Sequence, residues 1–326
     1  MTVDVTEVKR RLNLFLNDPD LVDEYIERYG PLIDMKKIRE MKDVRDARLK
    51  KLNPMDTGDD PLFQIMVKCP VCYKDQIPCY ELKAKSQQIT LNKFLVPLYE
   101  GAGGFRSCDF SYITVTVCPQ CLFASPDKKD FSRKSSANNS WIKGQLSGNL
   151  ISALKEKTEE RKEIIKNVND YADYFKHPRL DNSAIASYRL AMARAKVEAW
   201  HEQPYAFYKL GSYALRIAYI MKEVHQDNTK VLIEALSYFE EAFKTSNCPQ
   251  EEIEMQVIYL IVALNLKLGD FKKANSYIGV FSSLHSTRVA EMKDNPKLNT
   301  VHIDKWSDKA KYLWEDREIS DLFENE

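Results

Sequence analysis

Two Cys-Pro-x-Cys pairs constrain the fold of this chain more than any other feature of its sequence. The first pair is Cys69 and Cys72, and the second is Cys118 and Cys121. Two residues between the cysteines let a tight turn aim both sulfurs at one ion, and four thiolates in two such pairs suit a tetrahedral structural zinc. We therefore expect these four cysteines to bind Zn²⁺, with each pair at the tip of a short hairpin.

Three other interpretations of the cysteines compete with zinc: a redox dithiol, a disulfide and inert buried thiols. A thioredoxin-like redox site has a single pair where a strand enters a helix, whereas both pairs here lie among strand-like segments. Residues 1–13 carry charges of both signs and do not resemble a secretory signal. We therefore expect a reducing cytoplasmic location, where disulfides are rare. A redox pair and simple burial stay open as alternatives.

Length and charge limit the other classes of protein to which the chain could belong. Its 326 residues leave room for two or three domains, and its 48 basic and 48 acidic residues cancel. A neutral chain has no overall attraction for nucleic acid or for an anionic membrane. The longest apolar run, Val257 to Leu264, is much shorter than the roughly 20 residues of a membrane helix. We expect no membrane partner.

The first domain boundaries follow from composition. Residues 1–60 are predicted to form an N-terminal helical extension that ends in a linker rich in proline and aspartate. Its stretch from Leu32 to Leu52 has more basic than acidic side chains. Such a stretch is typical of a solvated helix face, and a docking surface for an acidic partner is the alternative.

Residues 61–134 are predicted to form a zinc-ribbon module. Three segments are rich in β-branched and aromatic residues and roughly alternate, as strands do: Phe63 to Val67, Gln76 to Leu82, and Tyr112 to Val117. The glycine-rich stretch from Gly101 to Gly104 is expected to be a loop and not a dinucleotide-binding turn, since no strand-turn-helix pattern surrounds it.

Residues 135–326 are predicted to be helical throughout. Lys155 to Lys166 mixes charges and reads as a connector or an exposed helix, and stronger helices begin at Ser183 with an apolar set that includes Trp200. A final helix is expected from Ile303 to Phe323. The fold class is therefore mainly α, with a small β zinc-ribbon module and a C-terminal helical repeat.

The type of repeat is indicated by the spacing of small and aromatic residues. Ala235, Phe239 and Ala242 have the spacing of the second helix of a tetratricopeptide repeat, and Ala274 and Ile278 give a weaker second match. Repeated alanines allow two helices to approach closely, as in a helical solenoid. Generic helix packing is the alternative explanation of the same stripe.

Several short segments also match a known family. They are Cys69-Pro70-Val71-Cys72, Val117-Cys118-Pro119-Gln120-Cys121 followed by Phe123-Ala124, Asp130-Phe131 and, less specifically, Ser187-Tyr188-Arg189-Leu190-Ala191 and Leu215-Arg216-Ile217-Ala218-Tyr219. On these residues the chain resembles the domain-of-unknown-function 2225 family, a largely bacterial group. The resemblance covers about residues 62–285. It implies a ribbon with two cysteine pairs followed by tetratricopeptide-like helices, and it implies no known reaction.

The chain departs from the family pattern at the residue after each pair. The family usually has glycine there, where a positive φ is expected, but this chain has Tyr73 and Leu122. A non-glycine residue in that conformation costs about 1 kcal/mol. Structural zinc contributes about 10 kcal/mol or more in small modules, so the metal site remains the favoured interpretation.

The remaining chemistry-bearing residues do not form a recognisable active site. Cys79, Cys108 and Cys248 are expected to be packing residues, although Cys79 or Cys108 could replace one of the four ligands. The five histidines lie outside the ribbon, and His201-Glu202 lacks the second histidine of a metalloprotease motif. A catalytic zinc would keep an open position and usually use His or carboxylate ligands. We expect no enzymatic activity.

The first functional hypothesis is a cytoplasmic interaction protein, in which a structural zinc ribbon supports a helical repeat that binds a protein or peptide. Candidate contact residues are Tyr205, Tyr208, Tyr213 and Tyr219. The alternative is nucleic-acid binding by the ribbon, which has a mild excess of lysine and arginine but lacks a strong basic and aromatic stripe. A thiol oxidoreductase is the third hypothesis. The sequence makes no prediction of the oligomeric state.

Overall fold

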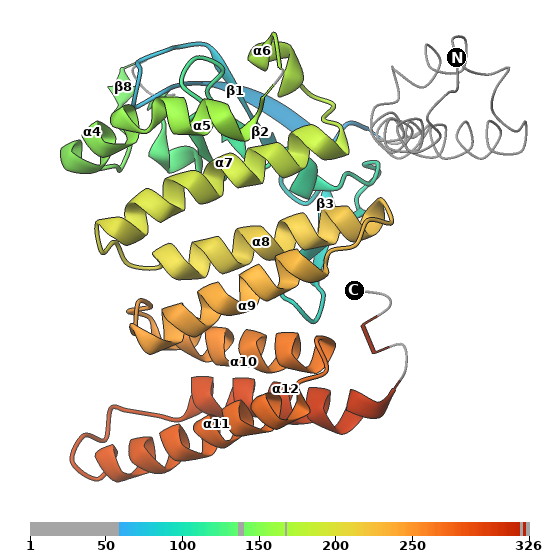
Figure 1. The fold of residues 1–326 in the computed structure, drawn as a ribbon, viewed down its shortest axis with the longest axis vertical. Helices are drawn as coiled ribbons and strands as arrows, with labels where there is room; N and C mark the ends of the chain where they lie inside the picture. The colour runs from blue at the N-terminus through green and yellow to red at the C-terminus, as the bar shows by residue number, and fades with distance from the viewer. Residues whose placement is uncertain (1–58, 136–139, 167, 320–321, 324–326) are drawn as a thin grey trace, which may run out of the picture.

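The computed structural model of the chain describes residues 59–135, 140–166, 168–319 and 322–323. All but the last two residues of the predicted N-terminal extension (1–60), including its basic stretch from Leu32 to Leu52, lie outside the described residues. The described part is mainly helical with small sheets. Its strands gather at one end, and its longer helices form a stack that extends away from them (Figure 1).

A four-stranded antiparallel sheet forms the base of the β-rich end. Its strand order is β2 (Ile77–Leu82), β1 (Leu62–Lys68), β7 (Ser132–Lys134) and β8 (Trp141–Ile142). The predicted strands at Phe63 to Val67 and Gln76 to Leu82 are confirmed as β1 and β2. They pair in antiparallel register, and the directly paired Val67 and Ile77 are fully buried on one face.

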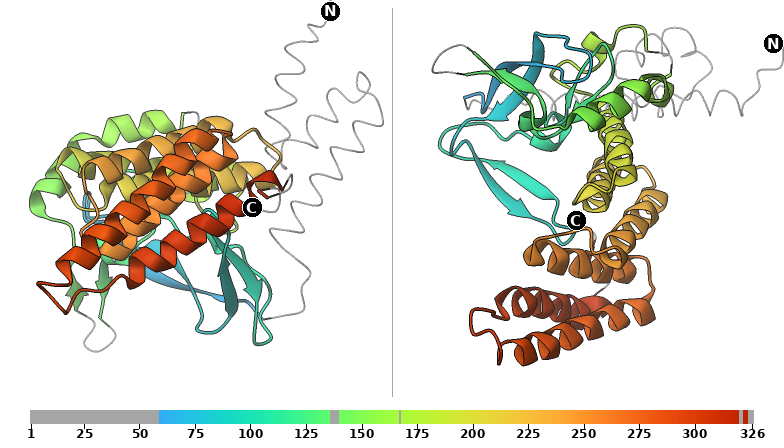
Figure 2. Two further views of the ribbon diagram at one scale, coloured as in Figure 1. Left: turned by 90° about the horizontal axis from the view of Figure 1, so that it is seen from below. Right: turned by 90° about the vertical axis from the view of Figure 1, so that its left-hand side faces the viewer.

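Two further hairpins complete the β-rich end. β5 (Thr116–Val117) pairs with β6 (Ala124–Ser125), and β3 (Gln87–Leu91) pairs with β4 (Pro97–Gly101). The β3–β4 hairpin, which the sequence did not predict, reaches along the side of the helix stack (Figure 2). The Asn92 carboxamide oxygen accepts hydrogen bonds from the backbone N–H groups of Phe94 (3.0 Å) and Val96 (2.9 Å), which shapes the tip of the hairpin. Both residues are buried in the main core.

Two secondary-structure predictions in this region are wrong. The segment from Tyr112 to Val117 was expected to be one strand, but it begins in the short 3₁₀ helix η2 (Phe110–Tyr112) and only its end forms β5. Asp109 caps η2 by accepting the Ser111 N–H, which favours a turn over an extended chain. Helix was expected throughout from residue 135, but Trp141 and Ile142 extend the sheet as β8.

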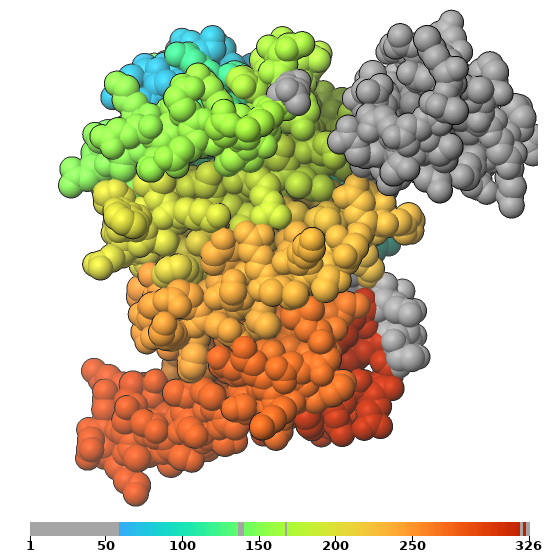
Figure 3. All heavy atoms as spheres, viewed as in Figure 1, coloured from blue at the N-terminus to red at the C-terminus, as the bar shows by residue number. Residues whose placement is uncertain are grey.

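Successive long helices pack against one another along the stack. They are α7 (Asp181–Trp200), α8 (Ala206–Glu223), α9 (Thr229–Lys244), α10 (Glu251–Lys267), α11 (Phe271–Glu291) and α12 (Val301–Glu315). Side chains fill the space between neighbours (Figure 3). Small residues permit close approach: a Cβ on Gly211 of α8 would lie 2.7 Å from the Phe239 ring of α9. Ala235, Phe239 and Ala242 are all buried, as their spacing predicts.

Shorter helices connect the β-rich end to the stack. They are η3 (Lys128–Asp130), α4 (Gly148–Glu156), α5 (Thr158–Ile164) and α6 (Tyr171–Tyr174). The segment from Lys155 to Lys166, read as a connector or exposed helix, lies mainly in α5, which packs on α7. The final helix was expected to reach Phe323, but α12 ends at Glu315 and the 3₁₀ helix η4 (Asp316–Glu318) follows.

The buried apolar residues form two clusters. The larger cluster combines residues of the β-rich end, such as Val115 and Leu122, with residues from all six helices of the stack. The smaller cluster surrounds the cysteine pairs and includes Leu150 and Leu154 of α4. The domain boundaries near residues 60 and 134 stay a prediction, and the larger core extends across the second of them.

None of the helices within the described residues combines the length and the apolar composition that crossing a lipid bilayer demands.

Candidate metal centre

The two cysteine pairs occupy equivalent turns. The first pair lies in the turn of the β1–β2 hairpin, and the second lies in the turn of the β5–β6 hairpin. In the first turn the Cys69 N–H donates to the Lys74 carbonyl (2.8 Å), and the Cys118 N–H donates to the Phe123 carbonyl (2.8 Å) in the second. Each bond spans five residues, so both turns hold their sulfurs in the same way.

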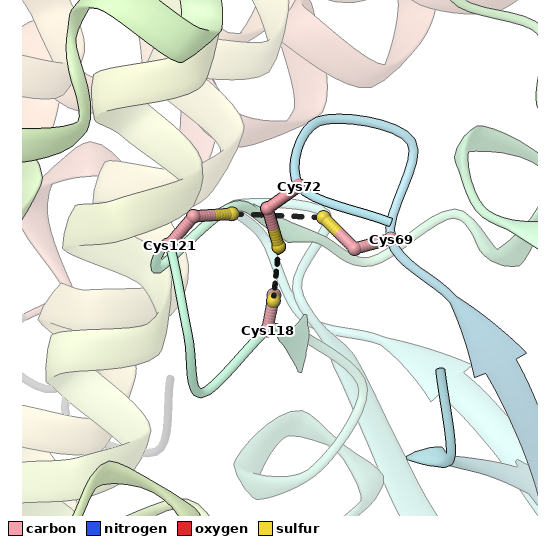
Figure 4. A group of neighbouring side chains, drawn as sticks. All are labelled: Cys69, Cys72, Cys118 and Cys121. Carbon is pink, nitrogen blue, oxygen red and sulfur yellow. Dashed lines mark hydrogen bonds between the residues drawn. The ribbon is translucent and has the colours of Figure 1, made fainter. Parts of the chain in front are cut away.

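The four sulfurs point toward one another (Figure 4). Cys69 Sγ lies 3.6 Å from Cys121 Sγ, and Cys72 Sγ lies 3.5 Å from Cys118 Sγ. All four sulfurs lie within 4.8 Å of one another. A tetrahedron with metal–sulfur bonds of about 2.3 Å has sulfur–sulfur edges of about 3.8 Å. The cluster therefore has the size of a tetrahedral thiolate site, and its contacts are too long for the roughly 2.05 Å bond of a disulfide.

Both residues after the pairs adopt the left-handed conformation. Tyr73 has a φ of 62° and Leu122 has a φ of 57°, as the family's usual glycine at these positions suggested. In each turn the N–H of this residue donates to the first cysteine's carbonyl, over 3.2 Å from Tyr73 and 2.9 Å from Leu122. The turns therefore keep their shape without glycine, at an expected strain of about 1–2 kcal/mol each.

The thiols strongly perturb one another. Hydrogen bonds from the Cys118 and Cys69 thiols lower the pKa of Cys121, so one thiolate is stabilised. Hydrogen bonding to Cys118 and Cys121, followed by burial, raises the pKa of Cys69. A second thiolate in this buried space would be repelled by the first. A cation among the sulfurs would remove this repulsion and favour the thiolate form of all four cysteines.

A buried arginine, which sequence reasoning missed, supports the second turn. Arg161 of α5 is 1% exposed and donates from Nε to the Cys121 carbonyl (3.0 Å) and from Nη1 to the Leu154 carbonyl (2.7 Å). Burial lowers its pKa, and the negative charge of the cysteine cluster opposes that shift. Arg161 thus fixes the second cysteine turn and places a positive charge near the sulfurs. Leu150, Leu154 and Arg161 recur at helical spacing, which is the one signal that could have identified it.

An ionic network joins the same module to the helix stack. Arg194 of α7 donates to the Asp130 and Glu198 carboxylates and to the Ser125 hydroxyl. Lys209 of α8 donates to Glu198 over 2.8 Å. Burial raises the pKa of the Glu198 carboxyl, but Arg194 and Lys209 outweigh it and hold the pKa below its usual 4.5. The network ties β6 and η3 to two helices.

The other cysteines lie outside the cluster. The cluster therefore consists of the four predicted cysteines, and neither Cys79 nor Cys108 replaces one of them. Burial raises the pKa of Cys79, and burial raises the pKa values of Cys108 and Cys248 to about 11. All three thiols are therefore protonated at neutral pH. Among the described residues, the only group of three or more potential metal ligands contains cysteines alone, so no histidine joins it.

The predicted surface residues lie partly in the core. Tyr205, Tyr208, Tyr213 and Tyr219 are only partly exposed and pack against the larger core cluster. Trp200, predicted to be an apolar packing position of its helix, is instead 86% exposed at the end of α7.

A family profile described as uncharacterised protein conserved in bacteria (DUF2225) matches residues 62–306. No match was found among curated proteins or solved structures. The match covers both cysteine turns and most of the helix stack, so the chain belongs to the DUF2225 family.

Proposed function

We propose that this protein is a non-enzymatic cytoplasmic interaction protein, in which a structural zinc ribbon is fixed to a tetratricopeptide-like helical scaffold that binds a protein or peptide. Cys69, Cys72, Cys118 and Cys121 are the proposed zinc ligands. When bound, zinc supplies the charge that keeps four thiolates together and closes the two turns onto one another.

The donor set supports zinc over other metals and over redox chemistry. Four sulfurs in a tetrahedral arrangement favour zinc or iron, and a site closed by four protein ligands is typical of structural zinc. The sulfur–sulfur contacts join cysteines of different turns, Cys69 with Cys121 and Cys72 with Cys118. All four sulfurs lie within 4.8 Å of one another as one cluster, whereas a Cys-x-x-Cys redox site needs only the two sulfurs of one turn.

The packing of the helices supports a tetratricopeptide-like scaffold. Ala235, Phe239 and Ala242 are buried at the contact of α9 with its neighbours, and Gly211 lies against the Phe239 ring. Stacked helix pairs of this kind present extended surfaces for partner binding.

One observation carries the proposal of a binding function: an open groove of about 890 Å³ runs between α4–α5 and α7. Its lining includes apolar Met192, Val197 and Ile164 and charged Lys196 and Glu160. Trp200 stands at its end with 86% of its surface exposed. Exposed tryptophan beside an apolar groove with a polar rim is typical of a protein-binding hot spot.

The experiment is site-specific photo-crosslinking in the native cell, followed by a binding measurement. A photoreactive aromatic residue at Trp200 should capture a protein that the same residue at Tyr312, an exposed position on α12, does not capture. With the captured protein purified, Trp200→Ala should weaken binding by about 30-fold or more, as expected of a hot spot worth about 2 kcal/mol. Equal capture at both positions, or unchanged affinity, would contradict the proposal.

A further inference from the structure

An aromatic–lysine patch, formed by Lys68, Tyr73, Lys134 and Trp141, lies on the outer face of the four-stranded sheet. Val67 and Ile77 pair on the inner face, so the neighbouring Lys68 points outward. Lys68 pairs with Ser132 in β7, and Lys134 pairs with Trp141 in β8. Directly paired residues share a face, so the two lysines and the tryptophan are on the same side.

The two aromatic side chains of the patch are exposed and flanked by ammonium groups. Tyr73 is 68% exposed and Trp141 is 43% exposed. Lys68 Nζ lies 5.7 Å from the centroid of each ring, and Lys134 Nζ lies 5.9 Å from the Trp141 centroid. The cysteine turn holds Tyr73 in place, because it follows Cys72 directly. The patch is therefore a pre-formed surface of flat rings alternating with positive charge.

The strands that carry the patch supply no compensating negative charge to it. β1, β7 and β8 contain no acidic residue. Glu81 of β2 pairs with Phe63, which lies on the opposite face, and binds Lys128 over 2.6 Å. Across the part of the chain that the structure describes, neither Lys68 nor Lys134 forms an ion pair with a carboxylate. The patch is thus complementary to an anionic partner.

We propose that the aromatic–lysine patch binds single-stranded nucleic acid. Each nucleotide offers one flat base and one phosphate, the two groups that a ring and an adjacent ammonium accept. In a duplex the base faces are stacked inside the helix. Its phosphates could contact the lysines, but its bases could not stack on Tyr73 and Trp141. The patch shares no residue with the groove at α7. The proposal of nucleic-acid binding is therefore independent of the proposed protein partner.

The test measures fluorescence anisotropy of labelled 20-nucleotide oligo-dT and oligo-rU with the full zinc-loaded chain at low salt. Trp141→Ala should weaken binding by about 5- to 150-fold, the range expected for losing one stacked base. Trp141→Phe, which keeps a ring, should restore most of the affinity. Tyr312→Ala is the matched control, because it removes an exposed aromatic side chain from α12, and it should have no effect.

The lysines are tested by the salt dependence. Lys68→Ala combined with Lys134→Ala should reduce the slope of log K against log salt by about 1.4, because each lost phosphate contact contributes about 0.7 for a single strand. Zinc content, measured on every variant, shows that the cysteine turns are intact. Absence of oligonucleotide binding by the wild-type chain would overturn the proposal, as would binding that all patch variants retain. Binding of the wild type, dependent on Trp141, to anionic phospholipid vesicles but not to oligonucleotides would assign the patch to a membrane surface instead.

Discussion

Replacement of Arg161 by methionine tests whether α5 supports the metal centre. Methionine retains much of the length of the side chain but donates no hydrogen bonds. The change leaves the carbonyls of Cys121 and Leu154 without their donors, which lie at 3.0 and 2.7 Å in the wild-type protein. It also removes the buried positive charge near the cysteine cluster.

The expected loss of stability follows from these two carbonyls. An unsatisfied buried acceptor costs about 1–3 kcal/mol, so loss of the donors to both carbonyls should cost about 2–6 kcal/mol of stability. Removing a buried cation recovers part of its desolvation penalty. We therefore expect Arg161→Met to lower the free energy of unfolding by about 2–4 kcal/mol. Loss of a group that supports a metal ligand typically weakens metal binding by about 10- to 100-fold.

Arg179 provides a matched control. It is also buried and also donates to two carbonyls, those of Val115 (2.6 Å) and Phe175 (3.0 Å), but neither belongs to a cysteine turn. Urea unfolding of the zinc-loaded variants should show destabilisation by both Arg161→Met and Arg179→Met. Competition with a chromogenic chelator should show weaker zinc binding only for Arg161→Met. Equal zinc affinities of the two variants would refute the supporting role of Arg161.

Three further predictions concern stability. Tyr73→Gly should raise the free energy of unfolding by about 0.5–1 kcal/mol in urea titrations, because it relieves a positive φ at an exposed position; a loss would contradict the strain argument. Gly211→Ala should destabilise the protein by about 1–3 kcal/mol, because the added Cβ meets the Phe239 ring. Its control is Gly279→Ala, whose added Cβ meets nothing within 4 Å. That change should be neutral or should stabilise the protein by up to about 1 kcal/mol. Glu198→Gln should lower stability by about 3 kcal/mol at pH 7. Since the folded protein holds the Glu198 pKa below its usual 4.5, this difference should be complete above pH 4.5, shrink as the pH falls below 4.5 and be lost below the folded-state value; a difference that does not shrink below pH 4.5 would contradict the pairing.

The cysteine turns were predictable because their geometry is local. Two intervening residues and a proline restrict each pair to a tight turn, and the positive φ values of Tyr73 and Leu122 follow from that turn. The strands β1 and β2 were equally predictable, because their β-branched and aromatic residues roughly alternate, as is typical of strands.

The residues that support the site depend on distant contacts, which local patterns do not reveal. Arg161 sits among exposed charges in the sequence and is buried only because α5 meets the second cysteine turn. The sequence predicts that Trp200 is a packing residue, yet it is the last residue of α7, and no neighbouring element within the described residues covers it. The β3–β4 hairpin was missed because neither strand contains a fully buried residue, so only its tip carries a core signal.

Zinc coordination itself is the most direct test of the central claim. X-ray absorption at the zinc edge, combined with elemental analysis of the purified chain, should show about one zinc per chain bound by four sulfurs at about 2.3 Å. Cys118→Ser should lose most of this zinc, whereas Cys248→Ser, which removes a buried thiol outside the cluster, should keep it. Fewer than four sulfur ligands in the wild type, or full zinc content in Cys118→Ser, would contradict the proposed centre.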